Sequence, residues 1–198
     1  KKTLCVAIPT FNKHENIQRK LESEIAVFNK YDIDIYIFDS SSDSLTEEVI
    51  EDYSKKGYSN IFLKKYNNNP SSNEKVYRIF EWAAEAGYEY LWMIHDHTVC
   101  NEEAIVFLMN ILKSEKNDFL LLNMQASDYK TEKFNKINDF LLKGAWRLNS
   151  FGASIVKTDT FLGGVDWTFM RRKYGDNKTL NYSHIGFYFE RIAEMKYP

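Results

Sequence analysis

The stretch Tyr90-Leu-Trp-Met-Ile-His-Asp-His97 decides the fold. Its apolar run, residues 90–94, predicts a strand buried on both faces, and the run stops abruptly at His95, Asp96 and His97. Buried strands of open α/β sheets carry ligands at their carboxyl ends. A carboxylate between two imidazoles suits a divalent cation such as Mn²⁺. The alternative interpretation is a polar loop that merely follows a core strand.

Other apolar runs lie on both sides of this stretch, and helical patterns separate them. We expect strands at 3–8, 33–38, 61–63 and 119–124, with a further strand at 151–156 and a last helix at 185–195. Three capping boxes are expected to begin helices, at Asn12 with Glu15, Ser44 with Glu47, and Ser71 with Glu74. This alternation predicts one α/β domain with a mostly parallel sheet flanked by helices.

Composition narrows the class of protein. The chain has 198 residues and 44% hydrophobic content, which fit one globular domain. Its net charge of −2 does not predict an affinity for nucleic acid. Cys5 and Cys100 are expected to be free thiols in a reducing, cytoplasmic compartment. No apolar run reaches the roughly 20 residues of a membrane helix. The chain stops at residues 197–198 directly after the expected last helix, so we expect a further region beyond it.

Three expected strand ends carry polar motifs: Pro9-Thr10-Phe11-Asn12, Asp39-Ser40-Ser41-Ser42 and His95-Asp96-His97. With Arg78 and Gly87 between the second and third, the chain resembles the family 2 glycosyltransferases of the GT-A fold over residues 3–125. That family shows Pro-Thr-Tyr-Asn, Asp-Asp-Gly-Ser and an Asp-x-Asp motif in this order. The chain shows no glycine-rich loop of the kind that binds dinucleotides or nucleoside triphosphates.

The resemblance implies a nucleotide-sugar donor, UDP-linked, bound across these strand ends. Asp39 would accept the imide N–H of uracil, the segment around Thr10 would pack against the base, and Arg78 would lie near the phosphates. The alternatives are a turn residue for Asp39, a core ring for Phe11 and a solvated helix arginine for Arg78. The implied nucleotide-binding set is Pro9, Thr10, Phe11, Asn12, Asp39, Arg78 and Asp96.

The His-Asp-His triplet departs from the family's Asp-x-Asp motif, because only Asp96 keeps a carboxylate. Asp96 and His97 are the implied metal ligands. Mg²⁺ prefers oxygen ligands whereas Mn²⁺ accepts imidazole, so Mn²⁺ is favoured over Mg²⁺. A transition-metal hydrolase or nucleotidyltransferase that also uses His184 is a weaker alternative, since no further metal-ligand spacing supports it.

The second half of the chain, residues 126–198, is expected to bind the acceptor, and residues 1–125 the donor. Inverting transfer needs a base that deprotonates the acceptor hydroxyl. The family's acidic pair is absent, which leaves His184 and Asp166 as candidate bases; a helix cap or a turn residue is the alternative for each. The aromatic and basic side chains of Trp146, Arg147 and Trp167 suit a carbohydrate acceptor, although any one of these tryptophans could belong to the core.

These features together predict an inverting glycosyltransferase that moves a sugar from a nucleotide-sugar donor to a glycan acceptor. The resemblance further implies a role in bacterial-type surface polysaccharide assembly and a location in the cytoplasm, at the inner face of the cell membrane. The other function considered is a sugar-nucleotide binding module that has lost activity, because part of the metal motif and the acidic pair are absent. Transfer or donor hydrolysis with and without Mn²⁺ separates the two.

Overall fold

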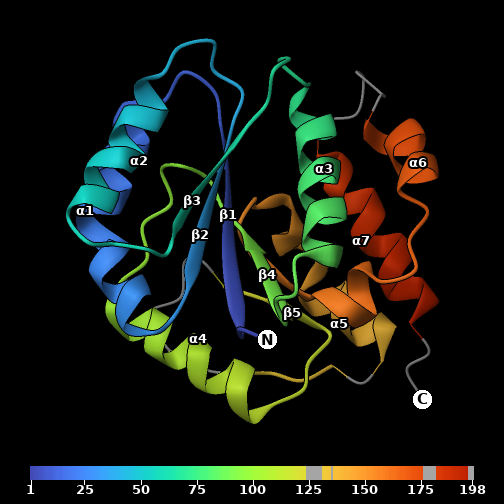
Figure 1. The fold of residues 1–198 in the computed structure, drawn as a ribbon. Helices are drawn as coiled ribbons and strands as arrows, with labels where there is room; N and C mark the ends of the chain where they lie inside the picture. Colours follow the sequence, from blue (N-terminus) through green and yellow to red (C-terminus); the bar gives the residue numbers. More distant parts are fainter. Residues whose placement is uncertain (124–130, 135, 176–181, 196–198) are drawn as a thin grey trace.

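The computed structural model describes residues 1–123, 131–134, 136–175 and 182–195. A central sheet has the strand order β3-β2-β1-β4-β6-β5 (Figure 1). All of its pairings are parallel except those of β6, which runs antiparallel to both neighbours. The strands are β1 Leu4–Thr10, β2 Asp34–Asp39, β3 Ile61–Lys65, β4 Tyr90–Met93, β5 Phe119–Leu121 and β6 Ser154–Lys157.

Helices cover both faces of this sheet, with α1, α2 and α4 on one face and α3, α5, α6 and α7 on the other (Figure 1). The helices are α1 His14–Lys30, α2 Leu45–Lys55, α3 Ser72–Glu85, α4 Glu102–Ser114, α5 Ile137–Lys143, α6 Trp167–Met170 and α7 Ser183–Glu194. Short turns of 3₁₀ or π type lie at Ala145–Asn149, Thr158–Leu162 and Arg171–Gly175. The expected α/β fold with a mostly parallel sheet is confirmed.

Strand β1 joins two hydrophobic cores, because its successive side chains point to opposite faces. Leu4, Val6 and Ile8 belong to the core under α1, α2 and α4, and Cys5 and Ala7 belong to the core under α3 and α7. All five are fully buried. A strand that is buried on both faces reads as a continuous apolar run, as β1 and β4 do.

The later strands differ from expectation in their details. The expected strand at 151–156 forms as β6, and it inserts between β4 and β5, so that residues from the second half complete the sheet. The expected strand at 119–124 is shorter, since β5 ends at Leu121 and Met124 lies outside the described residues. The segment 130–138 was expected to be a loop; residues 130 and 135 are not described, and Ile137 already begins α5.

Two of the three expected capping boxes are wrong. Ser71 caps α3 as expected, because its hydroxyl accepts a hydrogen bond from the Glu74 N–H at 3.1 Å. Ser44 precedes α2, but its hydroxyl donates to the Glu48 carboxylate instead of accepting from the backbone. Asn12 lies outside α1 in the left-handed region, with φ of 54°. Lys13, not Asn12, occupies the N-cap position of α1, and no side-chain hydrogen bond caps this end of the helix.

Candidate functional site

The ends of β1 and β2 are joined through Asp39, which is fully buried. Thr10 and Asp39 are register partners at the carboxyl edge of the sheet. One Asp39 oxygen, Oδ1, accepts hydrogen bonds from the Ser41 N–H at 2.9 Å and the Ser41 hydroxyl at 2.5 Å. The Asn12 N–H donates to the same hydroxyl at 2.7 Å. The two predicted motifs therefore form one hydrogen-bonded unit.

Two lysines complete this unit, and neither was predicted from the sequence. Lys65, at the end of β3, donates to Asp39 Oδ2 at 2.9 Å and to the Asp43 carbonyl at 2.5 Å. Lys75, in the first turns of α3, donates to the Thr10 carbonyl and to the Ser40 hydroxyl, both at 2.7 Å. Lys75 is only 5% exposed. Lys75 lies four residues before the buried Ile79, on the same face of α3, and this spacing could have indicated from the sequence that Lys75 faces the core.

Burial disfavours the charged form of both Asp39 and Lys75. Burial opposes the ionisation of Asp39, but the hydrogen bonds from Ser41 and Lys65 outweigh it, and the pKa of Asp39 is lowered. Burial lowers the pKa of Lys75 to about 8, although the charge of Asp39 partly opposes this. At neutral pH two ammonium groups therefore surround one carboxylate. Lys65 and Lys75 therefore place positive charge at the carboxyl edge of β1 and β2, next to the carboxylate of Asp39.

Strand β4 pairs with β1 as far as Met93 and Ala7, so the His95–Asp96–His97 turn leaves the sheet at the same edge as the ends of β1 and β2. The rings of His95 and His97 stack with centroids 4.8 Å apart. His97 Nδ1 is 3.1 Å from Asp96 Oδ1, and the Asp96 side chain is 12% exposed, against 69% for His97. Burial is the main cause of a lowered pKa at His95.

Asp96 and His97 can supply one carboxylate oxygen and one imidazole nitrogen to a cation. Among the described residues no group of three or more His, Cys, Asp or Glu side chains is arranged to hold a metal ion. A cation here would therefore need oxygen ligands from the bound substrate as well. A mixed oxygen and nitrogen donor set fits Mn²⁺ better than Mg²⁺.

His184 lies close to the same turn, at the start of α7. The Phe151 ring contacts His95, with centroids 4.4 Å apart, and His184, with centroids 5.6 Å apart. His184 is 6% exposed, and its Nε2 lies 3.3 Å from the Leu148 carbonyl oxygen. Burial lowers the pKa of His184 to about 4, so its ring is neutral at pH 7. Phe151 was expected only as a strand residue.

The other predicted acceptor-side residues lie in different settings. The exposed Asp166 accepts a hydrogen bond from the Phe169 N–H at 2.9 Å, which makes it the cap of α6. Trp167 is half-buried and packs on Phe80 and Phe187 of the core. Of the two readings of this tryptophan, the structure supports the core one.

Trp146 remains open to solvent, with 60% exposure. The Arg147 guanidinium lies 4.9 Å from its ring centre, and the Nε atom of Arg147 is buried without a hydrogen-bond partner among the described residues. An exposed aromatic face beside a cation is the kind of surface that a sugar can contact.

Two predicted donor-side residues also differ in their settings. Arg78 forms an ion pair with Glu74 on α3 and lies over the Tyr66 ring, 5.4 Å from its centre. It therefore has partners of its own before any ligand binds. Phe11 is 44% exposed, so the alternative of a core ring does not apply to it.

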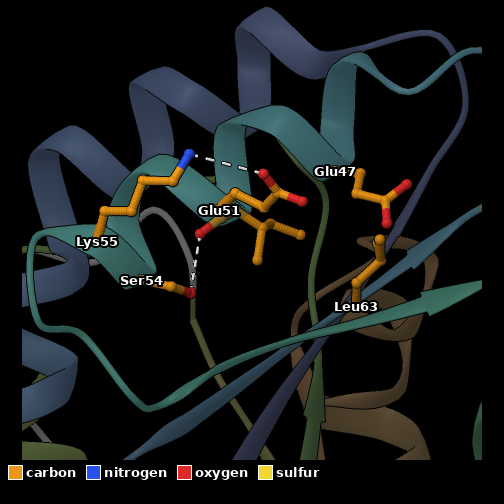
Figure 2. Close-up of a pocket in the computed structure, with 6 residues that line it drawn as sticks. Glu47, Glu51, Ser54, Lys55 and Leu63 are labelled. Atoms are coloured by element: carbon orange, nitrogen blue, oxygen red, sulfur yellow. Dashed lines mark hydrogen bonds and ion pairs between the residues drawn. The ribbon is translucent and has the colours of Figure 1, made fainter.

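A hollow between α2 and β3 lies apart from all of these residues (Figure 2). Glu47, Glu51 and Lys55 line it, and Lys55 pairs with Glu51 at 3.7 Å. A lining with two carboxylates and one ammonium would repel a diphosphate. This hollow is therefore a poor candidate for an anionic ligand.

The fold is a mixed α/β domain with a mostly parallel sheet, and polar side chains follow the ends of β1, β2 and β4 at one edge of this sheet. Glycosyltransferases of the GT-A type share this fold. The model of the family described as "Glycosyl transferase family 2" matches residues 5–188. The chain belongs to this family.

Solved structures agree on the fold. TarS 1–349 from S. aureus superposes with a TM-score of 0.63 at 14% identity, over 96% of this chain and 55% of that one. The mannosyltransferase PcManGT from Pyrobaculum calidifontis, solved with GDP-Man and Mn²⁺, gives 0.59 at 12% identity, over 96% and 52%. The galactosyltransferase LgtC, solved with donor and acceptor sugar analogs, gives 0.55 at 10% identity, over 91% and 68%.

The present chain spans about half the length of the TarS and PcManGT chains. A comparison with curated protein sequences found no significant match. Among the described residues, no helix has the length and apolar character that crossing a membrane requires.

Proposed function

We propose that the chain transfers a sugar, with inversion, from a UDP-linked donor to a carbohydrate acceptor. The observation that carries this proposal is the hydrogen-bonded unit of Asn12, Asp39 and Ser41 at the same edge of the sheet as the Asp96–His97 pair, in a chain of glycosyl transferase family 2. A TarS structure in complex with UDP-GlcNAc, which superposes with a TM-score of 0.59 at 17% identity, supports the choice of donor class.

The base of the nucleotide would lie against Thr10, Phe11 and Asp39, with Pro9 and Asn12 shaping the turn. A carboxylate has about four lone-pair sites, and the hydrogen bonds from Ser41 and Lys65 use three of them. One site therefore remains by this count, and because the Asp39 side chain is fully buried, Lys65 would have to move aside for the imide N–H of uracil to reach it. The exposed ring of Phe11 offers a face on which the base can stack.

Asp96 and His97 would hold Mn²⁺ together with oxygens of the donor diphosphate. Such a cation supplies positive charge to a leaving group that becomes more negative as the glycosidic bond breaks. The PcManGT structure with GDP-Man and Mn²⁺ supports a divalent cation in this fold. Arg78 would add a second positive charge near the phosphates after releasing Glu74.

We assign the acceptor and the base to residues 140–190. Trp146 and Arg147 form the exposed part of this surface, and Trp167 supports it from the core. The Leu148 carbonyl can only accept, so His184 Nε2 carries the proton, and Nδ1 would receive one from an acceptor hydroxyl. Asp166 is the second candidate base. The LgtC structure with an acceptor sugar analog supports a carbohydrate acceptor.

The cellular role that we propose is bacterial-type surface polysaccharide assembly in the cytoplasm, with peripheral contact at the inner face of the membrane. The family relationship supports the polysaccharide role. Cys5 and Cys100 are both free thiols, which suits a reducing compartment.

A ligand screen followed by an activity assay tests the proposal. Specific nucleotides and nucleotide sugars should raise the melting temperature by mass action, and UDP with Mn²⁺ should raise it more than UDP with chelator. Release of UDP from a UDP-sugar in the presence of glycan acceptors should then depend on Mn²⁺. Binding of GDP-sugars in preference to UDP-sugars would overturn the donor assignment, and binding without any turnover would favour a binding module.

A further inference from the structure

A buried ion pair lies in the middle of α1, on the side that faces the core. Lys20 Nζ and Glu24 Oε2 are 2.6 Å apart, and their side chains are only 3% and 2% exposed. The apolar residues Ile17, Leu21 and Ile25 surround them on the same helix and are buried as well. Two charges therefore occupy positions where the helical pattern alone would place apolar side chains.

Both ions also bind the main chain of the segment that follows β4. Lys20 Nζ donates to the Thr98 carbonyl at 2.5 Å, and Glu24 Oε1 accepts from the Cys100 N–H at 2.6 Å. The Thr98 N–H in turn donates to the His95 carbonyl at 3.2 Å, which closes the turn that carries Asp96 and His97. The ion pair and the turn thus form one continuous set of hydrogen bonds.

Stability alone does not account for this arrangement. Taking two charges out of water costs free energy, and an apolar pair of similar volume in such a position is often neutral or stabilising. What an apolar pair would lack are the two hydrogen bonds to Thr98 and Cys100. The charged pair holds a donor and an acceptor of the main chain, two residues apart, at fixed positions against α1.

We infer that Lys20 and Glu24 form a positioning device that sets the place of the Asp96–His97 turn relative to the end of β1. This inference rests on the proposed function, in which that turn binds the diphosphate and the cation. Both side chains are buried, so they would act through the turn and not on the donor itself. The base half of the site, around Asp39, has its own hydrogen bonds and should not depend on them.

The double variant Lys20→Met with Glu24→Leu tests the inference. It removes the hydrogen bonds to Thr98 and Cys100 and replaces the two charged side chains with apolar side chains of similar volume. We expect its melting temperature to stay close to that of the wild type or to rise. The transfer rate should fall roughly 10- to 100-fold, the order expected when reacting groups are misplaced. UDP with Mn²⁺ should bind more weakly, while uridine should keep its affinity.

A matched control lies at the amino ends of β1, β2 and β4, away from the candidate site. Tyr88 donates to Asp34 Oδ2 at 2.5 Å, in another buried ionic network that Lys2 joins at 2.8 Å. Tyr88→Phe should lower the melting temperature and leave the ratio of UDP to uridine affinity unchanged. A general loss of stability is thereby distinguished from a displaced turn.

If the double variant does not fold, Glu24→Gln replaces it. Cys100 and Lys20 bind different oxygens of Glu24, and in glutamine one of these two positions becomes an NH₂ donor, which cannot accept from either partner. One anchor is lost, and a smaller fall in transfer rate and in UDP affinity is expected. A wild-type transfer rate and a wild-type ratio of UDP to uridine affinity in the folded variants would overturn the inference. A wild-type protein that binds no nucleotide would instead refute the proposed function itself, and the inference with it.

Discussion

Asp39 is ionised although it is fully buried, because Ser41 and Lys65 donate hydrogen bonds to it. Asp39→Ala should weaken UDP binding by roughly 1–3 kcal/mol, the order expected when a charged hydrogen-bond partner is lost. Calorimetry measures this loss, and circular dichroism checks that the variant is folded. Asp52→Ala, on the exposed side of α2, is the control. Unchanged UDP affinity in a folded Asp39→Ala protein would remove Asp39 from base recognition.

His184 links residue ionisation to stability. Its pKa is about 4 in the folded protein and about 6.5 in the unfolded chain, so the unfolded state binds more protons between these values. The free energy of unfolding should therefore fall as the pH drops from about 6.5 to 4, by up to roughly 3 kcal/mol. Denaturant titrations across this range should show a shallower fall for His184→Gln. An NMR titration with a midpoint near 6.5 would contradict the prediction.

The same residue carries the proposed base. His184→Gln should lower the transfer rate by about 10²- to 10⁴-fold while donor affinity stays close to wild type. Asp166→Asn keeps an oxygen that can cap α6 and so tests the second candidate without disturbing the fold. If both variants transfer sugar at the wild-type rate, the base lies outside residues 140–190.

At the scale of elements, α3 connects the two sides of the site. Lys75 binds the ends of β1 and β2, and Tyr77 donates to the Ser183 carbonyl at 2.9 Å, at the start of α7. Lys75→Met should loosen the strand ends and weaken UDP and uridine binding alike, each by roughly 1–3 kcal/mol. Calorimetry with both ligands checks this. A loss confined to UDP would show instead that Lys75 acts on the phosphates.

The elements themselves were largely predictable from local patterns. The apolar runs of β1 and β4, and the cap at Ser71, depend on neighbours in the sequence, and they were predicted correctly. The insertion of β6 between β4 and β5 depends on pairing between segments about 60 residues apart. No local pattern encodes that pairing or its antiparallel direction.

The candidate site was less predictable for the same reason. Asp39 and Asp96 stand at strand ends, where the sequence alone could place them. Lys65 and Lys75 reach Asp39 and Ser40 only through the tertiary fold. Asn12 does not cap α1, because it lies in a left-handed turn two residues before the helix begins and Lys13 occupies the N-cap position.

At the scale of the whole molecule, the site has two parts that rest on different strands. The part around Asp39 belongs to β1, β2 and β3, and the part around Asp96 and His97 follows β4. Asp96→Ala and His97→Ala should therefore weaken UDP binding in the presence of Mn²⁺ and leave uridine binding similar. Thermal shift with both ligands measures the contrast. Equal losses for UDP and uridine would mean that the two parts do not act separately.

The position of β6 has a consequence for how this protein is made. When residues 1–121 have left the ribosome, one edge of β4 has no neighbour and β5 has no strand to pair with, because β6 separates them in the finished sheet. An open strand edge invites pairing with other chains. The nascent chain must keep that edge protected until residues 154–157 emerge. Phe151 is synthesised just before residues 154–157, and its ring packs against His95. The sheet and the contact between Phe151 and His95 are therefore completed at the same late stage of synthesis.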